Sequence, residues 1–306
     1  MGTPVFAVPV LEALVSAGHE VAAVYSRPDR PSGRGRRTAP TPVKEAASVM
    51  GIPVCQPPSL SSPDVQAELA ALAPDVIVVA AYGLFLPRAV LDLPCHSCLN
   101  IHPSLLPKLR GPSPVSTAIV DGATTTGVTI MLMDEGMDSG PVLAQRKTAI
   151  GEKETSEALT TRLFEMGAGL LVEVLPDWVE ERIQATPQDE SQATITRLLT
   201  RDDGRIDWNE GADRIARRVR GYAPWPGAFT HWGGKTLKII EARPDDRPAA
   251  DQPGRVAGSG AGDRIVISTG DGSLRVSRLQ LEGRRAGSAR DFLLGNGSIL
   301  GAQLGP

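Results

Sequence analysis

Apolar segments and helical patterns alternate along residues 1 to about 180. Two of the apolar segments, Asp75–Ala81 (DVIVVAA) and Gly127–Met133 (GVTIMLM), are almost continuous, which is typical of strands covered on both faces. Weaker patterns complete the series, with strands at Glu20–Tyr25 and Cys98–His102 and helices at Val8–Ser16, Pro42–Met50, Ser113–Val120 and Thr155–Glu181. This βαβ rhythm predicts an α/β fold with a doubly wound, mostly parallel, Rossmann-like sheet.

The pattern changes after residue 182. Residues 183–207 are mostly polar, which is typical of a linker, and a helix is expected near Glu210–Tyr222. Five short apolar segments with turn residues between them follow, at Ala228–Trp232, Thr236–Glu241, Gly254–Ala257, Arg264–Ser268 and Leu274–Leu281. We therefore expect a catalytic domain over residues 1–182, a linker over 183–207 and a small C-terminal β-barrel of OB-like type over 208–306.

The composition fits a chain of about two globular domains. The 306 residues are 41% hydrophobic and 22% charged, which is too apolar for a disordered chain. No apolar run approaches the length of a membrane-spanning helix, and the N-terminus shows no signal peptide. Three cysteines cannot make a disulfide framework, and the pair Cys95 and Cys98 has no second pair for a zinc site. We therefore expect a cytoplasmic protein with plain thiols and no metal.

Charge is distributed unevenly along the chain. Residues 1–200 carry 15 Lys and Arg against 22 Asp and Glu, a net charge of −7, whereas residues 201–306 carry 17 against 13, a net charge of +4. Inside the acidic part, the loop Arg27–Arg37 (RPDRPSGRGRR) has five arginines and one aspartate. A basic loop and a basic C-terminal third favour a polyanionic partner, although a solvated loop and a solvated face have the same charge pattern.

Asn100 and His102 lie at the end of a predicted strand. Because side chains alternate along a strand, both point to the same side of the sheet. The carboxyl ends of parallel strands line the ligand crevice in such sheets, and an amide beside an imidazole suits an oxyanion or a proton transfer. A histidine with a purely structural role is the alternative.

Asp134 and Asp138 follow the next strong strand, in a turn rich in glycine. A carboxylate near a histidine raises the pKa of the imidazole and selects its tautomer. Asp134 is explained equally well as a turn cap, whereas for Asp138 a functional role is favoured. Two strands that each deliver polar groups to one crevice are difficult to explain by packing.

Several stretches of the chain together resemble the methionyl-tRNA formyltransferase family. They are NIHPSLLPKLRGPSPV, GVTIMLMDEGMDSG, the loop RPDRPSGRG and the opening GTPVFAVP, and in the C-terminal part WPGAFTHWGGKTLKI and LQLEGRRAGSARDFL. Asn and His two residues apart with a later Asp are common to folate-dependent formyltransferases, including those that act on glycinamide ribonucleotide and on sugars. The PDRPSGRG loop and the second domain are the parts that favour a tRNA substrate.

The resemblance implies transfer of a formyl group from 10-formyltetrahydrofolate to the α-amine of methionine on initiator tRNA, for translation initiation. Asn100 and protonated His102 would stabilise the oxyanion, and Asp138 would keep His102 charged and help to remove the amine proton. The residues expected to border the folate are Ala81, Tyr82, Gly83, Ser104, Leu105, Leu106 and Pro107.

The tRNA would be held by basic residues of the loop and of the second domain, namely Arg34, Arg36, Arg37, Arg217, Arg218, Lys235 and Lys238. The two lysines are equally well explained as solvated strand ends. The expected partners are thus initiator methionyl-tRNA and folate, with a monomeric chain that binds no membrane. The alternatives are a formyltransferase that acts on an amino sugar or nucleotide amine, and a non-catalytic RNA-binding relative.

The chain departs from the family pattern at its start. Members of the family begin with a short apolar strand before the GTP turn, whereas Met1 stands directly before Gly2. The first strand of a doubly wound sheet is central, so its loss is expected to leave two neighbouring strands without backbone partners and to open the core. A start downstream of the true one and a compromised chain are the two explanations, and the intact motifs favour the first.

Overall fold

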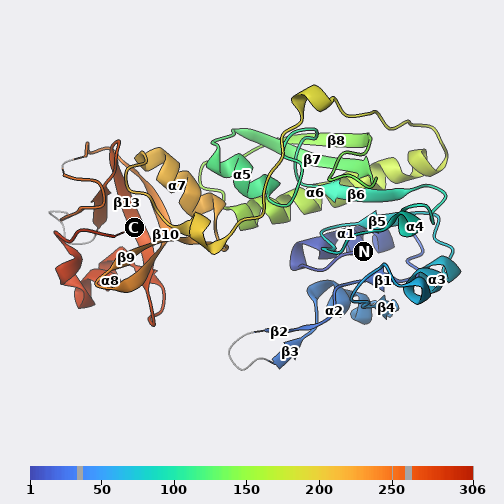
Figure 1. Cartoon of the computed structure of the whole chain (residues 1–306), viewed down its shortest axis with the longest axis horizontal. Coiled ribbons are helices and arrows are strands. Elements are labelled where there is room, and N and C mark those ends of the chain that lie inside the picture. The colour runs from blue at the N-terminus through green and yellow to red at the C-terminus, as the bar shows by residue number, and fades with distance from the viewer. Residues whose placement is uncertain (33–36, 250, 259–263, 306) are drawn as a thin grey trace. The chain divides into compact units, whose positions relative to one another are not determined.

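The computed structural model describes residues 1–32, 37–249, 251–258 and 264–305 (Figure 1). These residues form two compact units. The first unit contains residues 1–114, 125–149 and 160–196, and the second contains residues 115–124, 150–159 and 197–306. The domain boundaries expected at residues 182 and 207 stay predictions.

The first unit is built on parallel and antiparallel strands. They are β1 (Val24–Tyr25), β2 (Arg30–Ser32), β3 (Arg37–Ala39), β4 (Val54–Cys55), β5 (Ile77–Val79), β6 (Cys98–His102), β7 (Thr125–Leu132) and β8 (Val142–Ala149). β1 pairs in parallel with β4, β2 and β3 form a small hairpin, and a four-stranded sheet has the order β5-β6-β7-β8. β5 and β6 are parallel, and the α/β class is confirmed.

Helices flank these strands. They are α1 (Val8–Ser16), α2 (Pro42–Val49), α3 (Pro63–Ala71), α4 (Arg88–Leu91) and α6 (Ser156–Val179), whereas α5 (Pro114–Val120) belongs almost entirely to the second unit. α2 begins where Thr41 Oγ1 accepts a hydrogen bond from the backbone N–H of Lys44, with a proline in the first turn. α6 lies along the sheet (Figure 1), and a Cβ at its Gly167 would come within 2.6 Å of Ile101 and 2.9 Å of Val128. This glycine therefore lets α6 pack directly on β6 and β7.

β7 runs in the opposite direction to the one expected of a parallel sheet. It is antiparallel to β6, with Leu132 opposite Leu99 and Thr129 opposite His102, and β8 is antiparallel to β7. A continuous apolar run marks a buried strand but does not carry its direction, so the pattern could not distinguish the two cases. The chain consequently leaves β7 beside the beginning of β6, and not at the carboxyl end of that strand.

Met1 and Gly2 lie between β1 and β5, where the first strand was expected. The N–H of Gly2 donates to Tyr25 O (2.9 Å), the Met1 ammonium donates to Val78 O (2.6 Å), and Ala80 N–H donates to Met1 O (2.9 Å). The strand expected over residues 20–25 is only two residues long, Val24–Tyr25.

A cavity of about 520 Å³ continues from Met1 between the two halves of the sheet. It is lined by residues 19–25 on one side, by residues 72–78 on the other, and by apolar side chains of α1 and α6. We call it the N-terminal slot. Met1 itself lines the slot, so residues added before it would enter the slot.

The second unit contains one antiparallel sheet. Its strands are β9 (Ala228–Trp232), β10 (Lys235–Asp245), β11 (Val256–Gly258), β12 (Ile265–Ser268), β13 (Ser273–Leu281) and β14 (Gly287–Ser288). The order is β11-β12-β13-β10-β9, with β14 paired to β13. α7 (Ala212–Gly221) and α8 (Ala289–Gly295) accompany the sheet, and Ile215, Leu237 and Leu274 are completely buried in its core. The small OB-like β domain expected from five short apolar segments is confirmed.

Candidate active site

β6 delivers Asn100 and His102 to one face of the sheet of the first unit. The neighbouring Leu99 and Ile101 are buried on the opposite face, which is the alternation expected of a strand. His102 is only 4% exposed, whereas Asn100 is half-buried. The imidazole is therefore held by the protein, and the amide lies nearer to solvent.

Asp138 lies beside both of these side chains. Its Oδ1 accepts a hydrogen bond from Asn100 Nδ2 (3.4 Å), and its Oδ2 lies 3.5 Å from His102 Nδ1. The N–H of Gly111 donates to the same Oδ2 at 2.8 Å. Because β7 is antiparallel, Asp138 reaches β6 on the connection between β7 and β8, residues 133–141. The structure thus brings together the three residues for which a catalytic role was predicted.

Both ring nitrogens of His102 face oxygen acceptors. Nε2 lies 3.0 Å from the carbonyl oxygen of Leu109, and Nδ1 faces the carboxylate of Asp138. Both nitrogens are donors only in the imidazolium form, so this pair of acceptors suits a positively charged ring. The Nδ1 contact, at 3.5 Å, is longer than a normal N–H···O hydrogen bond, so this donor is not fully used.

Three residues around the site have the left-handed backbone conformation without being glycine. They are Ala81 (φ 49°), Leu109 (φ 61°) and Asp138 (φ 51°). This conformation is unfavourable for residues with a Cβ, and it persists where surrounding contacts hold it in place. Two of the three, Leu109 and Asp138, are the partners of the two nitrogens of His102.

The expected folate-binding residues lie on the loops that follow β5 and β6. Ser104 is completely buried and donates from Oγ to Lys108 O (2.7 Å), so its side chain shapes the loop. Leu106 and Tyr82 are also buried, and the Tyr82 hydroxyl has no partner among the described residues. The accessible members are the half-buried Leu105, Pro107 and Ala81 and the exposed Gly83. The two loops leave the same edge of the sheet, because β5 and β6 are parallel.

The basic residues expected to bind tRNA fall into three groups. Arg34 and Arg36 lie outside the described residues, and Arg37 lies in β3, opposite Ser32 of β2. Lys235 and Lys238 are exposed on β10. The third group, on α7, is held inside the second unit.

This third group is Arg217 and Arg218. Arg217 Nε donates to Val120 O (3.2 Å). Arg218 donates to a Glu210 carboxylate oxygen (2.7 Å) and to the carbonyl oxygens of Asp203 and Arg205, and its guanidinium lies 5.7 Å from the ring centre of Tyr222. The charge of Arg218 is engaged on several sides and is therefore poorly placed to bind a phosphate, whereas tRNA binding by Arg217 stays a prediction.

Asp134 caps its own turn. It accepts hydrogen bonds from Gly136 N–H (3.0 Å) and from the Ser139 hydroxyl (3.0 Å). The turn-cap interpretation of this residue is therefore confirmed. Among the described residues, no group of three or more His, Cys, Asp or Glu is placed to hold a metal ion, and no helix is long and apolar enough to cross a membrane.

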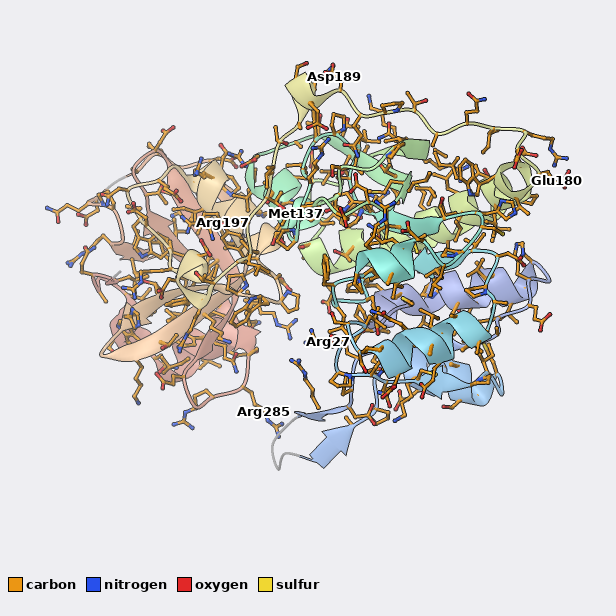
Figure 2. All side chains as sticks on the ribbon, turned by 45° about the vertical axis from the view of Figure 1, so that its right-hand side comes forward. Arg27, Met137, Glu180, Asp189, Arg197 and Arg285 are labelled. Atoms are coloured by element: carbon orange, nitrogen blue, oxygen red, sulfur yellow. The ribbon has the colours of Figure 1, made fainter. Side chains whose placement is uncertain are left out.

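Three residues next to the site were not singled out in the sequence. Arg110, Gln188 and Glu190 form a hydrogen-bonded group that contacts the backbone of Asp138. Gln188 and Glu190 belong to the polar segment expected to be a linker. Figure 2 shows Asp189, between them, on the segment that follows Glu180 at the end of α6. Isolated polar residues in a segment without periodicity carry no signal of such contacts.

Family models and relatives agree on one class of protein. Residues 1–175 match the formyl transferase family, and residues 198–297 match the formyl transferase C-terminal domain. A methionyl-tRNA formyltransferase of Roseiflexus sp. is 50% identical over 307 residues, covering 100% of this chain and 94% of the relative. Those of Chloroflexus aurantiacus and Dehalococcoides mccartyi are 49% and 45% identical, covering 96% and 100% of this chain and 95% and 97% of their own.

Solved structures show the same fold at low sequence identity. An N-formyltransferase from Helicobacter canadensis, in complex with folinic acid and dTDP-3-aminofucose, has a TM-score of 0.66 at 15% identity, covering 90% of this chain and 96% of its own. HypX from Aquifex aeolicus, in complex with tetrahydrofolic acid, has a TM-score of 0.59 at 22% identity, covering 81% of this chain and 43% of its own.

Proposed function

The chain belongs to the methionyl-tRNA formyltransferase family, and we propose that it transfers the formyl group of 10-formyltetrahydrofolate to the α-amine of methionine on initiator tRNA. It is an enzyme that formylates methionyl-tRNA, and its product serves translation initiation. The observation that supports the proposed site is the convergence of Asn100, His102 and Asp138 at β6.

In the proposed reaction, the neutral amine attacks the formyl carbon, and negative charge develops on the formyl oxygen. Asn100 Nδ2 is held only by a 3.4 Å contact, so it is available to donate to that oxygen. His102 Nδ1 is similarly available, because its distance to Asp138 exceeds that of a normal hydrogen bond. Each donor that is positioned before the reaction contributes about 3 kcal/mol to lowering the barrier.

Asp138 has two tasks in this proposal. Its carboxylate favours the imidazolium form of His102, and it accepts the proton that the attacking amine must lose. The bond from Gly111 N–H to Oδ2 keeps the carboxylate beside the ring while Oδ1 faces Asn100. The bond between the formyl carbon and the folate nitrogen then breaks, and the leaving nitrogen takes the proton that Asp138 accepted from the amine.

The loops after β5 and β6 are the proposed folate-binding region. The folate supplies a formyl group that is already activated by the folate nitrogen that carries it, and the accessible Ala81, Gly83, Leu105 and Pro107 offer apolar and backbone contacts to it. Ser104, Leu106 and Tyr82 are proposed to shape these loops from inside. The backbone N–H of Leu106 donates to Thr129 Oγ1 (3.2 Å), and this bond holds Leu106 in place.

We propose that the tRNA contacts the basic loop Arg27–Arg37 and the exposed lysines Lys235 and Lys238. Phosphate contacts of this kind give affinity that depends strongly on salt. The tRNA substrate is also the reason to place the reaction in the cytoplasm, and the chain is proposed to act there as a monomer that binds no membrane.

The test is transfer of labelled formyl from 10-formyltetrahydrofolate to charged initiator tRNA, with charged elongator tRNA and free methionine as controls. Label in the initiator tRNA alone is the expected result. Label in a nucleotide-linked amino sugar, with none in tRNA, would support the alternative suggested by the sugar formyltransferase fold. Binding of tRNA without any transfer would support a non-catalytic relative.

A further inference from the structure

Residues 186–196 are hydrogen-bonded to the rest of the first unit on both sides of the candidate active site. Thr186 and Val142 exchange backbone hydrogen bonds of 2.8 Å at the start of β8. Further along, Arg110 N–H donates to Thr194 O (2.9 Å), and Thr196 N–H donates to Arg110 O (2.7 Å). We call residues 186–196 the strap. Its attachments flank the loop that carries Asp138.

Gln188 of the strap holds the backbone around Asp138. Its Nε2 donates to the carbonyl oxygens of Asp138 (2.9 Å) and Gly140 (2.7 Å). Its Oε1 accepts from Arg110 Nε (3.0 Å) and Nη2 (2.9 Å). All the hydrogen-bonding positions of this amide are used, so its orientation is determined by its partners. Gln188 therefore supports Asp138 in its left-handed conformation.

Arg110 joins the strap to the loop that follows β6. The side chain is 7% exposed, and it makes a two-pronged contact with Glu190, with Nη1 to Oε2 at 2.9 Å and Nη2 to Oε1 at 2.6 Å. The Glu190 carboxylate raises the pKa of the guanidinium, and the guanidinium lowers the pKa of Glu190. With its side chain and backbone both engaged, Arg110 is not available to bind a substrate phosphate.

The two neighbours of Arg110 in the sequence contact the two predicted catalytic groups. Leu109 O accepts from His102 Nε2 (3.0 Å), and Gly111 N–H donates to Asp138 Oδ2 (2.8 Å). A displacement of Arg110 would therefore move the partners of both His102 and Asp138. A Cβ at Gly111 would meet Thr196 O of the strap at 2.8 Å, so the two segments are in close contact at this point.

We propose that Arg110, Gln188 and Glu190 are positioning residues that set the geometry between His102 and Asp138. They touch no substrate in this proposal, and they act through Leu109, Gly111 and the backbone of Asp138. The inference rests on the proposed function for its kinetic consequence. Its structural consequence, a fixed environment of the His102 ring, is independent of any substrate.

The first experiment compares Gln188→Ala and Gln188→Glu with the control Asp189→Asn. Gln188→Glu keeps the size of the side chain and an acceptor for Arg110, but it loses the two N–H donors toward residues 138 and 140. Asp189 is a matched control because, among the residues that the structure describes, its carboxylate accepts only from Ser191 and Gln192 within the strap. Both Gln188 variants are expected to lower kcat by about 10- to 100-fold with KM for tRNA and folate changed little, because misplaced catalytic groups cost rate.

The second experiment observes His102 directly. The chain has four histidines, so ¹⁵N-labelled imidazoles give few signals, and His102→Ala assigns the relevant one. Both Gln188 variants and Glu190→Gln are expected to shift the Nδ1 resonance of His102, whereas Asp189→Asn leaves it unchanged. Glu190 is exposed, so its substitution tests the three positioning residues without altering a buried side chain.

Unchanged His102 resonances together with unchanged kcat in the Gln188 variants would overturn the proposal. A lower kcat that follows only from a lower melting temperature, with normal His102 resonances in the folded protein, would also overturn it. If the proposed function itself fails, the unmodified chain shows no formyl transfer, but the shift of the His102 resonances is still expected.

Discussion

The N-terminal slot predicts that an added strand before Met1 stabilises the first unit. The perturbation is an extension of about five Val- and Ile-rich residues, which at about 3.3 Å each would span the slot between residues 19–25 and 72–78. The matched control is a Gly/Ser extension of the same length. Both extensions turn the Met1 ammonium into an amide, but only the first offers apolar side chains.

Burial of about four apolar side chains in the slot would contribute about 8 kcal/mol, at about 2 kcal/mol each. About five ladder hydrogen bonds would add about 1 kcal/mol each. Ordering about five residues would cost about 2 kcal/mol each. The net gain of about 3 kcal/mol corresponds to an increase in Tm of about 6–12 °C for a unit of this size.

The Met1 ammonium makes the stability of the first unit depend on pH. Desolvation lowers the pKa of the Met1 ammonium from 8.0 to about 5. Between these values, the unfolded chain binds a proton at this amine that the folded chain does not bind, so stability falls as the pH falls from 8 to 5. The loss is about 1 kcal/mol at pH 7 and about 4 kcal/mol below pH 5. Either extension is expected to abolish this contribution.

Calorimetric melting of the three chains at pH 6, 7 and 8.5 separates the two effects. The Gly/Ser extension should flatten the pH dependence, and the apolar extension should also raise Tm at every pH. An apolar extension that melts with the Gly/Ser control would show that the slot does not accept a strand. The backbone groups of Tyr25 and Val78 face Met1 and Gly2, so slower amide exchange at these two residues in the apolar chain alone would locate the new ladder.

Three further outcomes are expected. His102→Ala and Asn100→Ala should each lower kcat by about 100-fold or more with little change in tRNA affinity, because both donors act on the transition state; turnover near that of the unmodified chain would contradict the mechanism. Replacing the loop residues Arg34, Arg36 and Arg37 with alanine should weaken tRNA use and reduce the salt dependence of tRNA binding. An unchanged salt slope in filter binding would show that the loop is not part of the tRNA interface. Arg218→Ala should lower the unfolding free energy by about 2–3 kcal/mol, because Glu210 keeps only Arg214 and the carbonyl oxygens of Asp203 and Arg205 lose their donor, and it should leave the salt slope unchanged. Lys238→Ala should reduce the slope by about 1 without changing Tm.

The sequence pattern predicted most elements because their signals are local. β6 and β9 have the predicted bounds, and so does α1, since each shows its period over its own residues. The direction of β7 was not predicted, since buried strands show the same apolar run in either direction.

The contacts that hold the candidate active site in place could not be predicted, for a different physical reason. Asn100, His102 and Asp138 lie at strand ends and in a glycine-rich turn, where polar residues stand out against apolar neighbours. Arg110 and Glu190 are 80 residues apart, and their contact depends on a chain path that no local pattern encodes. The basic residues of α7 show the same limit. Arg218 has the charge expected of a phosphate ligand, but the carbonyl oxygens that engage it are determined by the fold of the second unit. Charge in a sequence therefore indicates which residues can bind an anion, and only the structure shows which of them are still free to do so.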